Sequence, residues 1–489
     1  MKTNKLTLAV LSALGLSAFA GAAFAYGPSE NYDYELRISG ASAQDDAVEA
    51  LFNTGATGLC LSDRDVWSYN NSKSDYRAVS CKTDAGKVPG LTDTNGDGLI
   101  KVLIFKRSHG GSALGVQPLA RDMAISGIDK STCTAGSTVA GATYNCTGLT
   151  SVTSDVGVSD VDPGIFRNVD NTPSEADAVL AGVNFPMTDV DVANLEVKSA
   201  AALIFGMPVT LNFRDALQDA MIANLTLDAT CDDSAANRDL ESCMPSLAKS
   251  AIASVMTGVL ADWSQLGVPG LAMPTSGDTA PKLCRRVNGS GTQASYNVKI
   301  LDNPCKGALS GASMGGHDGF NVFENSTSGD VRTCLNTQYT AGNYAIGLLS
   351  VESKPSGTRN FRWIKVDGVS PSLQNAAEGK YPIVVEQTFQ WRKSTVSNPL
   401  SGGKLKIAEA IVSNAANPTS IAARNAAFTY AGLETGYLAT LPNTTSATVP
   451  FTTAAPVWGY SHAANGNTLD NCRLPQVYDP GTSVPATGL

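Results

Sequence analysis

The chain is poor in histidine and has no closely spaced cysteine pairs, the features from which many metal sites are built. Its 489 residues include three histidines, His109, His317 and His462, which lie far apart in the sequence. None of its ten cysteines forms a C-x-x-C pair, the spacing typical of zinc and redox sites. We therefore expect neither a metal nor a cofactor.

Positive charge is also scarce. Lysine and arginine number 35 against 44 aspartates and glutamates, which gives a formal net charge of −9. A nucleic-acid-binding chain needs a basic face for the phosphate backbone, so we do not expect nucleic acid as a partner. A small anion remains compatible with an acidic chain, because a buried site can be locally positive.

Long apolar runs are missing except near the N-terminus. Lys2 and Lys5 precede the apolar stretch 6–16, and Ala23-Phe24-Ala25 offers the small residues that a signal peptidase reads. The stretch is too short to span a membrane comfortably. We expect residues 1–25 to be a cleaved signal peptide and the mature protein to be periplasmic or secreted, without membrane insertion.

Ten cysteines in an exported chain are typical of structural disulfides. The cysteine-bearing stretches 53–100, 128–155 and 224–250 are rich in Gly, Ser, Thr and Asp, and we expect them to be disulfide-stapled surface insertions. The sequence leaves the connectivity open. Pairing of sequence neighbours predicts Cys60–Cys81, Cys133–Cys146, Cys231–Cys243 and Cys284–Cys305, with Cys334–Cys472 left over.

Short apolar segments alternate with amphipathic ones along the chain. Strands are predicted at 34–38, 102–105, 202–205 and 345–349 from their apolar, β-branched and aromatic content. Ala43, Ala47, Ala50 and Leu51 share one face of a predicted helix, as do Ala294, Val298 and Leu301. This alternation predicts an α/β fold with parallel-rich sheets covered on both faces.

Four segments place Ser and Gly between an apolar strand and a predicted helix. They are 39–42, 108–112, 157–160 and 286–292. A helix N-terminus presents unpaired N–H groups and a partial positive charge, and serine adds a hydroxyl donor. One such segment is ordinary helix capping. Four in one chain, one of them carrying Arg286 ahead of Ser290, predict an anion site.

The segment R-V-N-G-S-G-T at 286–292 resembles the R-x-D-G-S-G-T segment of the periplasmic phosphate-binding proteins of ABC transporters. The resemblance implies a type II periplasmic-binding-protein fold, in which a two-strand hinge joins two α/β lobes and the ligand lies between them. Five further segments match the family in chain order: 38–43, 108–112, 157–160, 258–263 and 345–347.

The resemblance also implies a domain organisation and partners. Lobe 1 would comprise residues 26–190 and 346–479, lobe 2 residues 191–345, and residues 480–489 a flexible tail. The protein would be a monomeric solute-binding protein rather than an enzyme. It would bind inorganic phosphate or a related oxyanion reversibly and hand it to an ABC permease.

Carried over residue by residue, the resemblance implies a set of ligand contacts. Arg286 would form a charged fork on the anion. Asp160 would favour hydrogen phosphate over fully ionised sulfate, because a carboxylate needs a donor opposite it; it could instead cap the following turn. The expected ligand-binding residues are Ala41, Ser42, Ser112, Asp160, Arg286, Ser290, Gly291 and Thr292.

Two departures from the family pattern leave the ligand open. Gln44-Asp45 replaces the family's Thr-Phe, and Asn288 replaces the Asp after its Arg. We expect Asp45 to face solvent in the first turn of its helix. A second hypothesis is a secreted surface or structural protein that keeps this fold and uses its insertions to bind matrix or protein partners.

Three weaker signals are interpreted structurally. Asp93-Thr94-Asn95-Gly96-Asp97 begins like a calcium loop but lacks the glutamate at the twelfth position, so we expect a tight turn, with a calcium-stabilised turn as the alternative. Residues 311–315 match G-x-S-x-G without a preceding apolar strand, which predicts a flexible loop. His109 lies in a turn that would face the ligand. The sequence does not decide whether its side chain contacts the anion.

Overall fold

The computed structural model describes residues 26–136, 141–173, 185–232, 237–307, 313–355, 357–440, 450–463 and 469–477. The expected signal peptide and tail lie outside these residues. None of the helices in the described ranges is long and apolar enough to cross a membrane.

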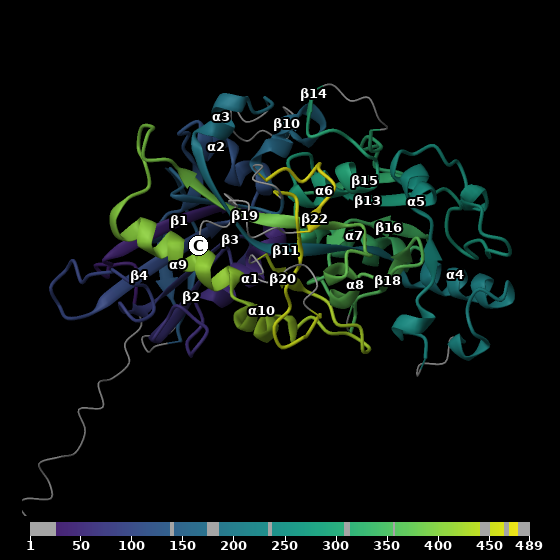
Figure 1. Ribbon diagram of the computed structural model, residues 1–489, viewed down its shortest axis with the longest axis horizontal. Coiled ribbons are helices and arrows are strands. Elements are labelled where there is room, and N and C mark those ends of the chain that lie inside the picture. Colours follow the sequence, from purple (N-terminus) through teal and green to yellow (C-terminus); the bar gives the residue numbers. More distant parts are fainter. Residues whose placement is uncertain are drawn as a thin grey trace, which may run out of the picture.

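The first half of the molecule is built around strand β1 (Tyr34–Gly40). It runs parallel to β4 (Ile100–Arg107) on one side and to β9 (Val156–Ser159) on the other. Strand β19 (Val384–Arg392) lies antiparallel beside β9. Helix α9 (Gly402–Ala416) packs apolar side chains onto this sheet (Figure 1).

The second half repeats the same strand order. Strand β13 (Lys282–Arg286) runs parallel to β15 (Val322–Asn325) and β16 (Ala345–Gly347). Strand β11 (Leu195–Thr210) lies antiparallel beside β16. In each half, therefore, three parallel strands are closed by one antiparallel strand.

The two halves are joined through β11 and β19. These strands pair antiparallel from Leu195 to Ile204, and β11 then continues beside β18 (Phe361–Val366) in the second half. The predicted strands 34–38, 102–105 and 202–205 fall within β1, β4 and β11, whereas 345–349 is divided between β16 and β17 (Leu349–Ser350), which Leu348 separates. The predicted fold class, an α/β architecture of two lobes with parallel-rich sheets and a two-strand connection, is confirmed by this pairing.

The helices follow the strand ends, and the shorter elements lie in the connections. Helix α1 (Asp45–Leu51) follows β1, α6 (Gly291–Lys299) follows β13, and α7 (Ser328–Thr340) follows β15. The remaining elements are α2 (Gln117–Ala120), α3 (Asp189–Ala193), α4 (Leu211–Ala223), α5 (Lys249–Met256), α8 (Leu373–Ala377), α10 (Pro418–Asn425), β5 (Ile125–Ile128), β8 (Leu149–Val152), β10 (Arg167–Asn168), β12 (Ser246–Leu247), β14 (Lys306–Gly307), β17 (Leu349–Ser350), β20 (Tyr437–Ala439), β21 (Tyr460–Ser461) and β22 (Gln476–Val477).

The first two insertions extend the sheet. Strand β3 (Ser72–Thr83) pairs antiparallel with β4, and β2 (Ser62–Tyr69) pairs with β3. Strands β7 (Thr143–Cys146) and β6 (Cys133–Ala135) continue the edge. These stretches are thus disulfide-stapled additions to the outer edge of the first half.

Five disulfides link all ten cysteines. The predicted pairs Cys60–Cys81, Cys133–Cys146 and Cys231–Cys243 are confirmed. The predicted pairs Cys284–Cys305 and Cys334–Cys472 are wrong: the bonds are Cys284–Cys334 and Cys305–Cys472. Pairing by sequence proximity fails here because α7, which carries Cys334, packs against β13, which carries Cys284.

The C-terminal strap, residues 450–463 and 469–477, crosses the middle of the molecule (yellow in Figure 1). Its His462 lies between Glu386 of β19 and Lys299 of α6, with Nδ1 2.9 Å from Glu386 Oε2 and Nε2 2.8 Å from Lys299 Nζ. Its Asn471 donates its amide N–H to Asp162 Oδ2 at 2.8 Å. Since Asp162 follows β9 and Lys299 belongs to α6, the strap holds both halves.

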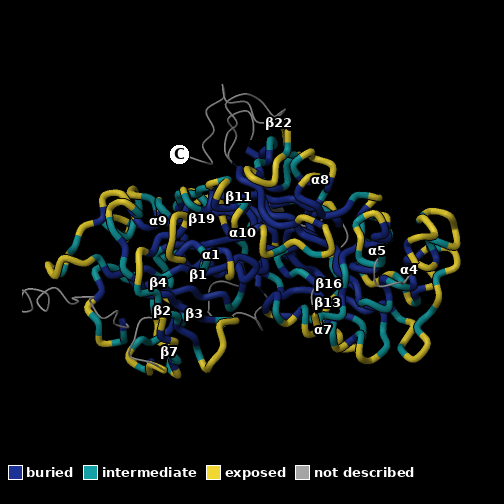
Figure 2. The backbone as a smooth tube through the Cα atoms, turned by 90° about the horizontal axis from the view of Figure 1, so that it is seen from below, coloured by how far each residue is buried: buried dark blue, intermediate teal, exposed yellow. Residues whose placement is uncertain are grey.

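The two halves also share one apolar core. The buried cluster at their junction includes Ala113, Val116 and Ile165 from the first half and Leu283 and Tyr296 from the second. Figure 2 shows buried segments on both sides of the junction. Separating the halves would expose this apolar surface to water at a cost that scales with its area.

We predict that Cys305→Ser/Cys472→Ser lowers the free energy of unfolding by about 2–5 kcal/mol, because the bond closes a loop of 167 residues in the unfolded chain. Cys231→Ser/Cys243→Ser, which opens a loop with a separation of 12, is the matched control and should cost less. Denaturant unfolding without reductant measures both. Equal losses in the free energy of unfolding would contradict the larger stabilising effect expected of the Cys305–Cys472 bond.

Candidate functional site

The carboxyl ends of the parallel strands of both halves face the same region between them. Ligands in open α/β sheets bind outside the carboxyl ends of the strands, so this region is the candidate site. The residues that the sequence predicted for ligand binding all follow these strand ends. They are Ala41 and Ser42 after β1, Ser112 after β4, Asp160 after β9, and Arg286, Ser290, Gly291 and Thr292 at the end of β13.

These residues contact one another both within the first half and across the junction. Asp160 donates its amide N–H to Ser112 Oγ at 3.2 Å, and Thr292 Oγ1 donates to Asp160 Oδ2 at 3.3 Å. A Cβ atom on Gly291 would lie 2.3 Å from Ser112 Oγ. The first turn of α6 therefore packs against the first half without space for an anion between them.

Both carboxylate oxygens of Asp160 accept hydrogen bonds from other side chains of the protein. Its side chain is buried, Oδ1 accepts from Gln44 Nε2 at 3.1 Å, and Oδ2 accepts from Thr292. Burial raises the pKa of Asp160, while the hydrogen bond from Gln44 and the charge of Arg286 oppose that rise. Its role in selecting a protonated anion stays a prediction.

Arg286 is buried and binds the turn between β15 and α7. Its guanidinium donates to Asn325 O at 3.3 Å, to Ser326 O at 2.8 Å and to Ser328 Oγ at 3.2 Å. Burial lowers the pKa of Arg286 to about 10, so it is charged at neutral pH. Its predicted direct fork on an anion stays a prediction; the observed contacts position Ser328.

A small cavity of about 110 Å³ lies next to this packed region, between the two halves. It is smaller than the roughly 300–1,000 Å³ of sites for drug-sized ligands, so its volume suits a small ion. Of the eight predicted ligand-binding residues, only Ser42 lines it. The other lining residues are Asp45, Asp46, Ser74 and Arg77 from the first half and Thr327, Ser328, Gly329, Arg332, Glu352, Ser353 and Arg359 from the second.

The cavity wall carries hydrogen-bond donors that an anion could use. Within the described ranges, the buried hydroxyl of Ser42 has no hydrogen-bond partner. Arg332 Nη1 donates to Ser353 Oγ at 3.1 Å and Arg359 Nη1 to Lys354 O at 2.7 Å. Neither of these two guanidinium groups forms an ion pair with a carboxylate in the part of the chain that is described.

The N-terminus of α7 also faces this cavity. Thr327 caps the helix, and its side chain and that of Asp330 form a reciprocal capping box. The cap satisfies the Asp330 N–H, while Ser328 and Gly329 lie in the first turn and line the cavity. First-turn N–H groups of a helix have no partner within the helix and attract anions.

Glu352 brings a carboxyl group to the same wall. It forms a hydrogen bond with the Tyr437 hydroxyl. Loss of hydration, and next the negative charge of Asp46, raise the pKa of Glu352 well above its usual value. A protonated carboxyl group can donate a hydrogen bond to an anion, whereas a carboxylate would repel it.

Sequence reasoning missed most of this wall. The segment Thr327-Ser328-Gly329-Asp330 follows an apolar strand and has the T-x-x-D spacing of a capping box, so a search for capping boxes would have found it. Arg77 lies on β3, inside a stretch that was expected to be an insertion. Arg332 and Arg359 belong to no sequence motif.

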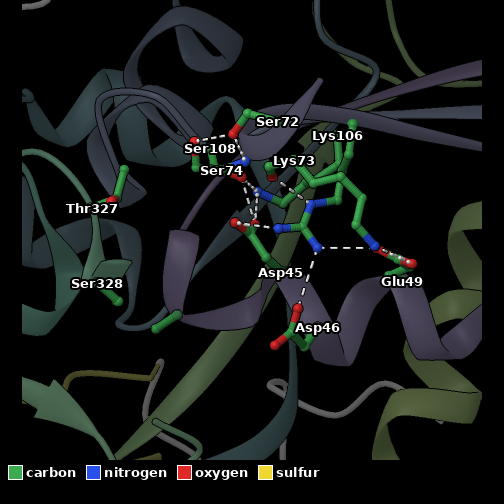
Figure 3. A network of polar contacts seen from close by, with 12 residues as sticks. Asp45, Asp46, Glu49, Ser72, Lys73, Ser74, Lys106, Ser108, Thr327 and Ser328 are labelled. Atoms are coloured by element: carbon green, nitrogen blue, oxygen red, sulfur yellow. Dashed lines mark hydrogen bonds and ion pairs between the residues drawn. The ribbon is translucent and has the colours of Figure 1, made fainter. Parts of the chain in front are cut away.

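Asp45 was expected to face solvent, and that expectation is wrong. The residue is 5% exposed, and its carboxylate lies 3.1 Å from Lys106 Nζ and 3.3 Å from Arg77 Nη2 (Figure 3). Lys106 is buried at the end of β4, where an ammonium group needs an anion beside it. Burial lowers the pKa of Lys106, and Asp45 opposes that shift.

Two of the three weaker signals are explained by contacts within the protein. The Asp93 carboxylate accepts the amide N–H groups of Asn95, Gly96 and Gly98, which is the expected tight turn. His109 stacks on Tyr76 and does not line the cavity. Of residues 311–315, Gly311 and Ala312 lie outside the described residues.

Comparison with known proteins gives remote structural similarity. No family model matches the chain, and no curated protein matches it. The chain is similar to a Clostridium perfringens protein described as a phosphate ABC transporter substrate-binding protein with bound phosphate, at 12% identity over 80% of this chain and 98% of that one, with a TM-score of 0.40.

Two further solved structures are similar at the same level. An ABC-type phosphate transport receptor from Vibrio cholerae has 11% identity over 78% of this chain and 94% of that one, with a TM-score of 0.36. A phosphate-binding protein from Stenotrophomonas maltophilia has 13% identity over 78% and 90%, with a TM-score of 0.36. At these values the similarity alone assigns neither a ligand nor a function.

We predict that Gly291→Ala lowers the free energy of unfolding by about 1–3 kcal/mol, because the added methyl group would overlap Ser112 Oγ and Asp160 Cβ. Gly329→Ala is the matched control: its Cβ would meet no heavy atom closer than 3.3 Å, and a change from glycine to alanine in a helix is neutral or slightly stabilising. Denaturant unfolding compares the two. A Gly291→Ala protein as stable as the control would contradict the packed junction.

Proposed function

We propose that the protein binds a small oxyanion, with phosphate as the first choice, in the cavity between its two halves and does no chemistry on it. The observation that carries the proposal is the convergence of Arg77, Arg332 and Arg359 with the unpartnered Ser42 hydroxyl on one small polar cavity. Guanidinium groups are the side chains best suited to bind phosphate-like oxyanions.

Different residues of the cavity would contribute different interactions with the anion. Arg332 and Arg359 would supply charge and N–H donors, and Ser42 and Ser328 would supply hydroxyl groups. Arg286 would act indirectly, by holding Ser328 and the start of α7 in place through its bonds to the turn. Ser112, Asp160, Ser290, Gly291 and Thr292 would fix how the two halves meet.

We further propose that the protein is exported and monomeric, and that it delivers its ligand to an ABC permease. Five disulfides are typical of proteins from oxidising compartments, which supports export. The proposed lobes remain residues 26–190 with 346–479, and residues 191–345. The observed strand pairing adds that β18, within the proposed first lobe, contacts β11 in the second half.

A secreted surface or structural protein is the second candidate. Two observations favour it: the shared apolar core and the disulfide-bonded strap both resist the large hinge motion by which two-domain receptors close on ligands. In that case the edge strands β2, β3, β6 and β7 would serve as the binding surface. Recovery of the protein in the culture medium, together with no response to any oxyanion, would favour this candidate.

Titration calorimetry with phosphate, arsenate and sulfate tests the proposal directly. Arg332→Gln and Arg359→Gln should each weaken binding by roughly tenfold to a hundredfold, as expected for loss of a charged hydrogen bond. Lys380→Gln, which removes an exposed positive charge that does not line the cavity, is the control. Absence of heat with all three anions would refute oxyanion binding.

The pH dependence of binding follows from Glu352. Its raised pKa keeps the carboxyl group protonated to higher pH than usual, and the groups near it are Asp45, Asp46, Asp160 and the Tyr437 hydroxyl. As the pH rises through that pKa, a carboxylate forms on the cavity wall and repels the anion. Sulfate affinity should therefore fall with rising pH, and this fall should be absent in Glu352→Gln.

Sulfate is the suitable probe for this measurement because it keeps its double charge throughout the range, whereas phosphate itself titrates near neutral pH. Calorimetry at intervals of half a pH unit from pH 5 to pH 8 gives the two profiles. Parallel profiles for the wild type and Glu352→Gln would show that Glu352 does not face the ligand.

A further inference from the structure

The Asp45 carboxylate is held by three donors at the wall of the cavity. Ser108 Oγ donates to its Oδ1 at 2.5 Å, Lys106 Nζ lies 3.1 Å from the same oxygen, and Arg77 Nη2 lies 3.3 Å from Oδ2. Figure 3 shows Asp45 at the start of α1, with Ser328 across the gap from the second half. Hydroxyl, ammonium and guanidinium donors are the groups that would surround a free oxyanion.

Lys106 depends on Asp45 for charge compensation. Its other contacts are with the carbonyl oxygens of Gly40, Ala41 and Arg107 and with Ser108 Oγ, all uncharged. Asp45 is the only carboxylate within ion-pair distance of Lys106 in the described ranges. A buried ammonium without a counter-ion is costly, so the position beside Lys106 requires an anion of some kind.

Arg77 is less dependent on Asp45. It also pairs with Asp46 at 3.3 Å and with Glu49 at 3.0 Å. Loss of the Asp45 charge would therefore leave Arg77 paired and Lys106 unpaired. The uncompensated charge of Lys106 would then lie beside the cavity that Ser42, Asp45 and Arg77 line.

We infer that Asp45 is a tethered carboxylate that competes with a free oxyanion for the positive charge of this cleft. The inference rests on the proposed function. Asp45 neutralises Lys106 and part of Arg77, and its own charge repels an anion that enters the adjoining cavity. It thereby limits the affinity of the site and restricts bound anions to the part of the cavity near Arg332 and Arg359.

The test is calorimetry with inorganic phosphate and sulfate on the full-length mature protein carrying Asp45→Asn, which keeps the side-chain shape and removes the charge. We expect binding at least about tenfold tighter than in the wild type, since removal of one like charge at short range is worth that much at a partly exposed site. Asp75→Asn is the control, because it removes a charge from the same strand as Arg77 without contacting Lys106 or lining the cavity.

A second measurement separates competition from a purely structural role. Without anion, Asp45→Asn should unfold at a lower temperature than the wild type, because Lys106 loses its counter-ion; added phosphate should then raise its Tm by more than it raises that of the wild type. In the double variant Asp45→Asn/Lys106→Met the buried charge is gone as well, and the gain in affinity should disappear.

The outcomes distinguish the two proposals. If the wild type binds an anion and Asp45→Asn binds it no more tightly, the tethered-carboxylate inference is wrong and the proposed function stands. If only Asp45→Asn binds, the Asp45 carboxylate takes the place of a free anion in the natural chain. The inference then stands and the proposed function falls. If Asp75→Asn gains as much as Asp45→Asn, the effect is general electrostatics and the inference is overturned.

Discussion

The antiparallel pairing of β11 with β19 is the constraint on which the rest of the molecule depends. Each strand closes the three parallel strands of one half, and their mutual pairing makes one continuous sheet out of two. Because the halves share this seam, the carboxyl ends of their parallel strands face each other. The region between the halves, with its buried cations, is a direct product of that seam.

In the described part of the chain, the positively charged side chains of this region are neutralised on one side and not on the other. On one side, Lys106 and Arg77 meet carboxylates of the chain itself. On the other, Arg332 and Arg359 bind uncharged oxygens of the chain and face the cavity. Removing one partner of a buried ion pair leaves the other charge uncompensated, so the charges of Lys106 and Arg77 are taken up by these carboxylates. The unpaired cations are therefore the ones whose charge is available to a ligand.

The sequence predicted the architecture better than the site. Strand β4 contains the continuous apolar run 102–105, and β1 alternates apolar with polar residues, so their existence and the α/β class could be predicted from local pattern. The extent of β3 could not, because its residues 72–75 are polar and its pairing with β4 is a long-range property. The three disulfides within insertions follow sequence proximity, whereas Cys284–Cys334 depends on how α7 packs on β13.

For the site, glycine and serine patterns identified the strand ends that meet, but not which of them leave space. Gly291 packs against Ser112 and Asp160, and only the three-dimensional structure shows that this contact leaves no space for an anion. Asp45 was misjudged because a position in the first turn of a helix says nothing about a buried lysine on a neighbouring strand. Its partner Lys106 is 61 residues away in the chain, and the two meet only through the pairing of β1 with β4.

The bond between Cys305 and Cys472 has a consequence for biogenesis. Proteins are synthesised from the N-terminus, and their domains generally fold as units during synthesis. Cys305 has to remain a thiol while 167 further residues emerge, although Cys284 and Cys334 are nearer along the chain. Oxidation of Cys305 before Cys472 has been synthesised would form a wrong bond, so we expect correct assembly to require a disulfide isomerase or late oxidation.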